Sequence, residues 1–203
     1  MIEQERAQDG ARARRAAPFF LALALALALA GCGGGAPQTF DLSAAPAKAA
    51  RPLRAQLSIR EPIASLDLDG QRILVRTGPE TIAYLADAQW ADRLPTLIQT
   101  RLVETFQNAK LMRSVARAGS GPSAEYSLEL DIRAFELDVS KSEAVVDFAV
   151  KIVSQTSGKV AAARIFRVTA PAAGTSGAAA TAALNTALSD AMTQIVAFTA
   201  AEI

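Results

Sequence analysis

Hydrophobic and polar residues alternate along the second half of the chain, which is the pattern of half-buried β-strands. Over 126–134 every second residue is apolar. At Phe135 the apolar positions shift by one residue, and such a shift inside one strand indicates a β-bulge. A second alternating run covers 144–152, the turn sequence 156–159 follows, and a third, weaker run covers 160–169. These runs predict a three-stranded antiparallel meander.

Two helices are predicted from apolar residues at helical spacing. A helix is expected over about 87–111, with six apolar residues on one face: Trp90, Leu94, Leu97, Ile98, Leu102 and Phe106. The alanine-rich segment 178–203 carries a narrow apolar seam and predicts the second helix. Three shorter runs, 55–60, 72–76 and 81–85, predict strands before the first helix.

The predicted order of elements is strands, helix, three-stranded meander, helix. Helices stabilise such a sheet by covering its apolar face. The length of 203 residues suits one domain. We therefore expect an α+β fold: a single domain with a largely antiparallel sheet, two main helices packed on one face, and a flexible tether before it.

The amino-terminal pattern is that of a secretory signal peptide. Arg12, Arg14 and Arg15 precede an apolar run of mostly Leu and Ala, 19–30, and the sequence Leu-Ala-Gly-Cys ends at Cys32. The apolar run is shorter than the roughly 20 residues that a membrane-spanning helix needs. The alternatives are an uncleaved membrane anchor and a secreted protein with a chance cysteine. A lone free thiol in an oxidising compartment would then need its own explanation.

The Leu-Ala-Gly-Cys ending resembles the lipobox of bacterial lipoproteins. In those proteins the cysteine sulfur takes a diacylglycerol, the chain is cut before the cysteine, and the new amino terminus is usually acylated, for example with palmitate. The resemblance implies a signal peptide over 1–31 and lipid attachment at Cys32. Gly33 stands where an aspartate signals inner-membrane retention in enteric bacteria. This favours the periplasmic side of the outer membrane over the inner membrane.

Residues 32–54 are interpreted as the lipidated amino terminus and a linker rich in Pro, Ala and Gly. Within this linker, Thr39–Leu42 form a small apolar island that is a candidate for docking on the domain. The domain itself is expected to cover 55–203.

The composition argues against several functions. The chain has no histidine, so the most common general base and metal ligand are missing. Cys32 is the only cysteine, and its acylation would remove thiol chemistry and disulfides. Residues 1–31 hold four of the 21 Lys and Arg and three of the 20 Asp and Glu, which leaves a neutral remainder without a basic block. This argues against nucleic acid as a partner. We expect no catalytic residue, metal or cofactor.

Five acidic residues could suggest paired carboxylates or a cation site: Asp67, Asp69, Asp131, Glu136 and Asp138. They alternate with apolar residues, and this pattern is typical of a solvated sheet face, which is the interpretation we favour. Lys141 and Lys151 do not follow a Ser-x-x-Lys pattern, so a Ser–Lys catalytic pair is not supported.

Several short motifs are similar to those of one known family. The most specific is an Ile-x-Tyr stretch followed by Trp-Ala. The matching segments are Phe40-Asp41-Leu42, Ile73–Arg76, Ile82-Ala83-Tyr84, Gln89–Leu94, Leu102, Phe106, Tyr126–Leu128 and Phe135-Glu136, together with the carboxyl-terminal helix. With these segments the chain resembles the ABC-type transport auxiliary lipoproteins, which include the paraquat-inducible lipoprotein C group.

The resemblance implies a non-enzymatic envelope lipoprotein. Such proteins act beside an ABC transporter, with its permease and ATPase, through a substrate-binding protein of the mammalian-cell-entry type. The system moves phospholipids or related apolar molecules between the two membranes, and the auxiliary lipoprotein holds its outer-membrane end. Three alternatives stay open: an envelope assembly or scaffold lipoprotein unrelated to transport, a lipid carrier with an apolar cavity, and a hydrolase, which the absence of histidine disfavours.

Two aromatic residues are candidates for contact with a partner, because aromatic anchors dominate many interfaces. They are Tyr84 and Trp90. The favoured alternative for both is the core, since Trp90 lies in register with Leu94 and Leu97. For the carboxyl-terminal helix we favour packing on its own sheet, with a homo-oligomeric ring or a partner's helix as further hypotheses.

Overall fold

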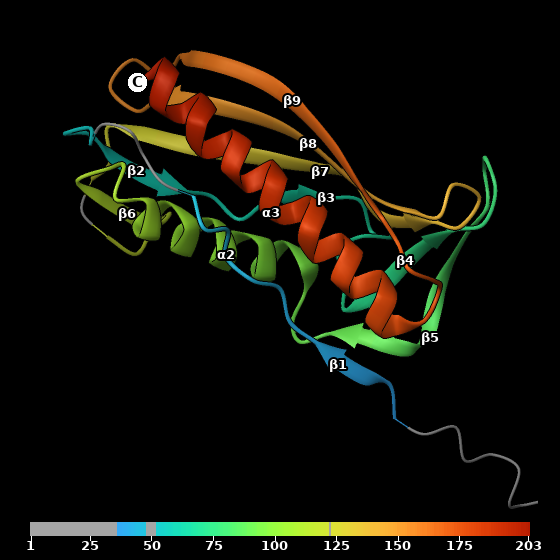
Figure 1. Ribbon diagram of the computed structural model, residues 1–203. Helices are drawn as coiled ribbons and strands as arrows, with labels where there is room; N and C mark the ends of the chain where they lie inside the picture. The colour runs from blue at the N-terminus through green and yellow to red at the C-terminus, as the bar shows by residue number, and fades with distance from the viewer. Residues whose placement is uncertain (1–35, 48–51, 122) are drawn as a thin grey trace, which may run out of the picture. The chain divides into compact units, whose positions relative to one another are not determined.

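The computed structural model describes residues 36–47, 52–121 and 123–203. Pro37 to Ile203 form one compact unit. Its strands are β1 (Gln38–Phe40), β2 (Gln56–Ile59), β3 (Ile63–Ala64), β4 (Arg72–Arg76), β5 (Ile82–Trp90), β6 (Ser114–Arg117), β7 (Tyr126–Asp138), β8 (Glu143–Ser154) and β9 (Val160–Pro171). Its helices are α2 (Leu94–Ala109) and α3 (Gly177–Glu202) (Figure 1).

Strand β7 joins the two parts of the sheet. Along one edge it pairs antiparallel with the whole of β8, and β8 pairs antiparallel with β9. Along its other edge it pairs with β2, β3 and β4 in turn, each in the parallel direction. Beyond these, β6 pairs with β2, β5 with β4, and β1 with β5. Most paired residues lie in the antiparallel meander, but the short pairings along the second edge of β7 are parallel.

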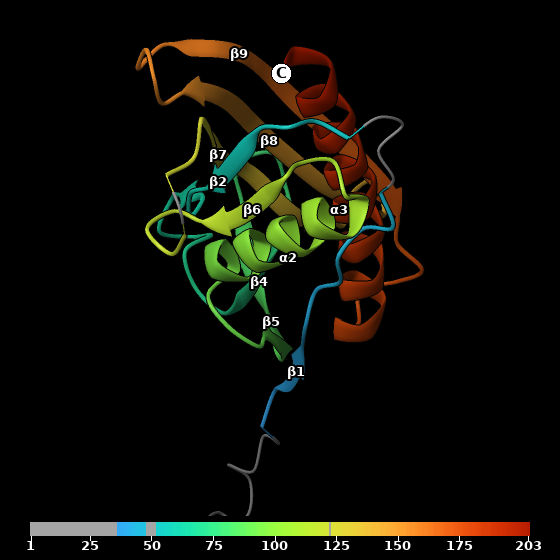
Figure 2. The ribbon, with the colours of Figure 1, turned by 90° about the vertical axis from the view of Figure 1, so that its left-hand side faces the viewer.

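Both helices cover the same face of the sheet (Figures 1 and 2). They meet where Thr105 Oγ1 of α2 lies 3.4 Å from Met192 Sδ of α3. Fully buried side chains fill the space between sheet and helices, among them Ile98, Leu102, Phe106, Leu184, Leu188 and Ile195. The predicted fold class, a single α+β domain with two helices on one face, is confirmed. In the described part of the chain, no helix has the length and apolar character needed to cross a membrane.

The meander contains the predicted bulge. Ile132 pairs with Phe148 and Ala134 pairs with Asp147, so Arg133 is the extra residue in β7. Because of this insertion, Ile132 and Phe135 are both buried in the core although they are three residues apart. The shift in apolar positions at Phe135 locates this bulge to within two residues.

The first helix begins later than predicted. Strand β5 continues to Trp90 and α2 begins at Leu94, so the predicted start near residue 87 is wrong. Residues 88–90 are instead held in the sheet, where they pair with β1. Pro95 stands in the first turn of α2, where its missing N–H is tolerated.

Residues 37–47, here called the strap, pack against the domain. Strand β1 pairs in parallel with β5, and the chain then rises between α2 and α3 (Figure 2). The Ser43 N–H donates to Asn185 Oδ1 of α3 at 2.8 Å, and the Ala45 N–H donates to Thr105 Oγ1 of α2 at 3.0 Å. The side chains of Leu42, Ala45 and Ala47 are also buried. The docked segment is therefore longer than the Thr39–Leu42 island expected within the linker.

Candidate functional site

The proposed lipid attachment site, Cys32, lies outside the described residues, as does the whole of the expected signal peptide. Lipid attachment at Cys32 stays a prediction from the sequence. The described strap begins only five residues after it.

Trp90 lies at the end of β5 and is 1% exposed. Its ring meets Phe135 of β7 edge-to-face, with 5.8 Å between centroids, and Phe135 stacks on Phe148 of β8. This geometry is typical of aromatic packing in a core. In this conformation the Trp90 ring has no surface to offer a partner.

Tyr84 keeps part of its surface accessible. It lies in β5, its hydroxyl donates to the carbonyl of Asp67 at 3.2 Å, and the guanidinium of Arg72 lies 3.7 Å from the centre of its ring. A cation over an aromatic face is a favourable arrangement. Of the two aromatic candidates, only Tyr84 is placed where a partner could touch it.

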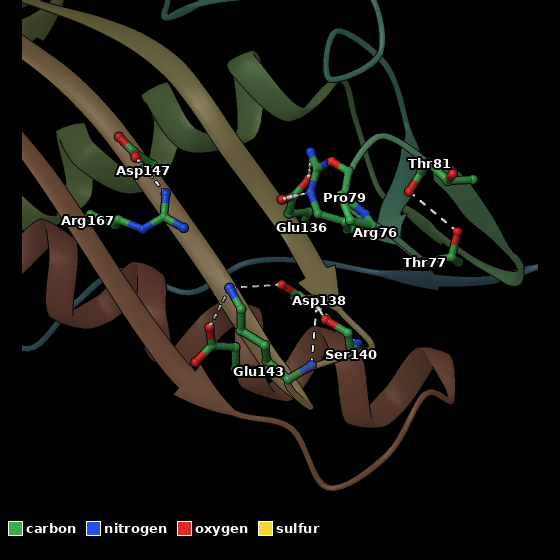
Figure 3. Close-up of polar contacts among 11 residues, drawn as sticks. Arg76, Thr77, Pro79, Thr81, Glu136, Asp138, Ser140, Glu143, Asp147 and Arg167 are labelled. Carbon is green, nitrogen blue, oxygen red and sulfur yellow. Dashed lines mark hydrogen bonds and ion pairs between the residues drawn. The ribbon is translucent and has the colours of Figure 1, made fainter.

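Three buried carboxylates lie on the sheet face opposite the helices (Figure 3). Leu137 of β7 packs with Ala180 of α3, so Glu136 and Asp138, its neighbours in the strand, point to the other face. The Glu136 carboxylate accepts two hydrogen bonds from Arg76 of β4, at 2.6 Å and 3.0 Å. This paired contact raises the pKa of Arg76 above its ordinary value.

Asp138 caps the turn between β7 and β8. Its Oδ1 accepts from the Ser140 hydroxyl at 2.6 Å and from the Ser140 N–H at 3.0 Å. Lys141 Nζ lies 3.3 Å from Oδ2. The hydrogen bond from Ser140 lowers the pKa of Asp138; burial opposes this effect, and Lys141 adds to it. Asp138 is therefore held as a carboxylate.

Asp147 of β8 lies between two arginines. Arg167, directly across in β9, donates to Oδ2 at 2.9 Å. Arg133, the extra residue of the bulge, places its Nε 3.5 Å from Oδ1, which is an ion-pair distance. Oδ1 itself accepts no hydrogen bond from the described residues. The bulge thus turns a cation toward a buried acid, which is a known use of such insertions.

The expectation of a solvated sheet face is wrong for Glu136 and Asp138, which are each 5% exposed. Local alternation cannot show that β4 brings Arg76 beside β7, because the two strands are 60 residues apart. Asp147 was missed for the same reason. Each of the three acids has its own cation or turn donors within the domain. We therefore interpret the three acids as structural residues.

A break in one of these pairs should destabilise the domain. Arg76→Met leaves the Glu136 carboxylate buried without its cation, and we expect a loss of about 1.5–3 kcal/mol in the free energy of unfolding, measured with urea. The double variant Arg76→Met/Glu136→Leu should recover most of this loss, because an apolar pair can replace a buried ion pair. Exposed Arg113 supplies the matched Arg→Met control. Equal stability of Arg76→Met and this control would contradict the account.

An ion pair also fastens the strap. Arg101 of α2 donates to the Asp41 carboxylate at 2.5 Å and to Glu104 at 2.7 Å, and the Leu42 N–H donates to Asp41 Oδ1 at 2.7 Å. Burial acts to raise the pKa of Asp41. The hydrogen bonds from Arg101 and Leu42 and the charge of Arg101 outweigh it, so the pKa of Asp41 is lowered.

The strap should loosen in acid. Because the pKa of Asp41 is lower in the folded state, its contribution to stability is complete above the unfolded value of about 3.9 and is lost as the pH falls through the folded value. The difference in unfolding free energy between the wild type and Asp41→Asn should therefore shrink from about pH 6 to about pH 3. Asp190→Asn, an exposed change on α3, is the control. A difference that is the same at both pH values would contradict this role for Asp41.

The described surface offers a pocket of about 430 Å³ between β2, β6 and the loop residues 118–121 and 123–124. Its lining includes Gln56, Ser58, Ser114, Arg60 and Arg117, which are polar or charged. Within the described residues, no three His, Cys, Asp or Glu side chains are grouped so that they could hold a metal ion. The apolar space between the sheet and the helices is filled by side chains.

One family model matches most of this domain. The model for the ABC-type transport auxiliary lipoprotein component matches residues 40–196, most of the described unit. The chain belongs to this family. It is a family of transport auxiliary lipoproteins and not one of enzymes, and its name implies association with an ABC transport system in the cell envelope.

Three known proteins are similar to this chain. An uncharacterised protein of Bradyrhizobium diazoefficiens is 32% identical over 173 residues, which cover 82% of this chain and 47% of that protein. The chain thus spans about half the length of this curated relative. The crystal structure of protein XCC0632 from Xanthomonas campestris is 27% identical, with a TM-score of 0.75 over 81% of this chain and 96% of that one. A crystal structure of an uncharacterised protein shares the fold, with a TM-score of 0.62, 15% identity and coverage of 83% and 99%.

Proposed function

We propose that the protein is a lipid-anchored accessory subunit of an ABC-linked system that moves phospholipids between the inner and outer membranes. In this proposal the diacylglyceryl group on Cys32 fastens the protein to the periplasmic side of the outer membrane. The folded domain holds the outer-membrane end of the conduit. The protein catalyses nothing and needs no cofactor beyond its own acyl chains.

The observation that carries the proposal is the family match over residues 40–196. The lipobox that precedes this segment supports it independently, because two or three acyl chains make release from a bilayer negligible, whereas one binds only marginally. A transporter that bridges two membranes needs a fixed point at each of them, and a lipid-anchored domain without a catalytic set suits that role.

The partner in this proposal is a substrate-binding protein of the mammalian-cell-entry type, which connects the domain to the ABC permease and ATPase. Tyr84 is a candidate for the contact, since it is partly exposed and backed by Arg72. A homo-oligomeric ring of this protein around the conduit is a second part of the proposal. Strict monomers at native abundance in mild detergent would contradict the ring.

The packed interior favours a holding role over a carrying role. A carrier that encloses a lipid needs an apolar cavity of a few hundred Å³. Here Leu102, Phe106 and Leu188 fill the space between sheet and helices with 0% exposure, and the pocket at β2 and β6 has a polar lining. The transported lipid would therefore pass through the partner's conduit.

The proposal is tested by phospholipid exchange between the membranes of the bacterium that encodes the protein. Phospholipids are pulse-labelled, the two membranes are separated, and the label in each is followed over time. Deletion of the protein should change the rate of redistribution, and the wild-type gene should restore it. A rate that deletion leaves unchanged would contradict the transport role and favour the envelope scaffold, which is the remaining alternative.

A further inference from the structure

The strap determines which end of the domain is fastened to the anchor. It enters beside the second half of β5, where Gln38 pairs with Ala88. Gly177, the first residue of α3, lies so close to this point that an added Cβ would collide with the Ala88 side chain and lie 3.4 Å from the Phe40 ring. We call this region the near end of the domain: residues 86–87 of β5, the loop 172–176 and the first turn of α3.

The chain reaches the main sheet at the opposite end. The Leu53 N–H donates to the Leu111 carbonyl at 2.6 Å, and Leu53 and Arg54 line a pocket together with Thr156 and Ile203. Ile203 follows α3, whose 26 residues span about 39 Å. We call this region the far end: Leu53–Arg54, the turn 155–158 and Ile203. The strap therefore begins at the near end, and the described chain resumes at the far end with residues 52–54.

The connection from Cys32 could therefore reach the domain at either of its two ends. If residues 33–54 were a free linker, the connection from Cys32 would end at Leu53, at the far end, and could extend to about 70 Å. With the strap docked, the connection from Cys32 reaches the domain at Pro37 and spans at most about 18 Å. It then ends at the near end.

We infer that the docked strap orients the domain on the membrane, with its near end toward the lipid headgroups and its far end toward the periplasm. This inference rests on the proposed lipid anchor at Cys32. The surfaces of the two ends agree with it. The near end exposes small uncharged residues such as Ala86, Ala173 and Thr175 beside Asp87, which lose little hydration on approach to a bilayer surface. The far end exposes the charged Arg54, and the exposed Glu125 lines the same pocket beside it.

The orientation is tested with a fluorescent label at either end of the full-length lipidated protein. Thr175→Cys marks the near end and Thr156→Cys the far end; both threonines are exposed, and the acylated Cys32 does not take the label. The proteins are reconstituted into phosphatidylethanolamine and phosphatidylglycerol vesicles that contain nitroxide-labelled headgroups. We expect several-fold stronger quenching at position 175 than at position 156. Equal quenching, or stronger quenching at position 156, would overturn the inference.

A longer connection supplies the control. About a dozen glycine and serine residues inserted between Gly35 and Ala36 leave every described contact intact and lengthen the free connection by up to about 40 Å. Quenching at position 175 should fall, and unchanged quenching would contradict the role of the short connection. Flotation of each protein with the vesicles separates the two proposals. A wild type that does not float overturns the anchor and the orientation with it, whereas flotation without a difference between the two labels overturns the orientation alone.

Discussion

The Cys32→Ser protein, exported behind a signal peptide that is cleaved without lipid attachment, is expected in the soluble periplasmic fraction, whereas the wild type stays with the membranes. Serine lacks the sulfur that takes the diacylglycerol in the lipoproteins that this amino terminus resembles. Each buried methylene of an acyl chain contributes about 0.8 kcal/mol to membrane binding, so the loss of two or three chains should abolish stable attachment. Fractionation after a carbonate wash measures the change.

The control for this variant is Gly35→Ser, which places the same side chain three residues away and should leave the protein with the membranes. Incorporation of labelled palmitate gives a second readout, which should be positive for the wild type and negative for Cys32→Ser. A Cys32→Ser protein that remains with the membranes after the wash would contradict the anchor and would require another means of attachment.

Trp90→Ala is expected to lower the free energy of unfolding by about 3–5 kcal/mol. The Trp90 side chain is 1% exposed and meets Phe135 in the core. Its removal leaves a large cavity between β5 and β7, and the surrounding strands can close it only in part. Urea unfolding of the lipid-free chain that begins at Gly33 measures the loss.

Two further variants serve as comparisons for Trp90→Ala. Trp90→Phe keeps an aromatic ring and should lose clearly less stability than Trp90→Ala. Tyr84→Phe removes one hydrogen bond to the Asp67 carbonyl and should lose about 1 kcal/mol. A loss below about 1 kcal/mol for Trp90→Ala would mean that the ring is not packed, and Trp90 would again be a candidate for contact with a partner.

The meander could be predicted from the sequence because it pairs only strands that follow one another along the chain. Strands β7, β8 and β9 follow one another along the chain, alternate in polarity and are joined by short turns, so neighbours in sequence are neighbours in the sheet. The bulge at Arg133 was predictable for the same reason, since an inserted residue changes the parity of the apolar positions. The face of α3 that packs on the sheet was also indicated by its apolar seam.

The other edge of β7 could not be predicted because its pairings join distant segments. β2, β3 and β4 are short, and their places along β7 depend on contacts between residues about 60 to 70 positions apart. The same limit explains the start of α2. The spacing of Trp90 and Leu94 fits a helix, yet the pairing of β1 with residues 88–90 keeps Trp90 in a strand.

The strap and the buried acids show how such long-range contacts change a functional interpretation. A segment rich in Pro and Ala has the composition of a linker, but Leu42 and Ala45 bury their side chains between two helices. The composition cannot show that α2 and α3 lie beside this segment. Likewise Glu136 has the neighbours of a solvated residue in sequence, and only the position of Arg76 explains its burial.

If the protein is the lipid-anchored subunit of an ABC-linked transport system, chemical crosslinking in intact envelopes should join it to the other components. A tag after Ile203 allows recovery of the crosslinked protein, and mass spectrometry identifies what is bound, with the soluble Cys32→Ser protein as the control. We expect recovery of a mammalian-cell-entry type protein together with its ABC permease from the anchored protein and not from the control. Recovery of only outer-membrane assembly factors or peptidoglycan-linked proteins would contradict the transport role and leave an envelope scaffold in its place.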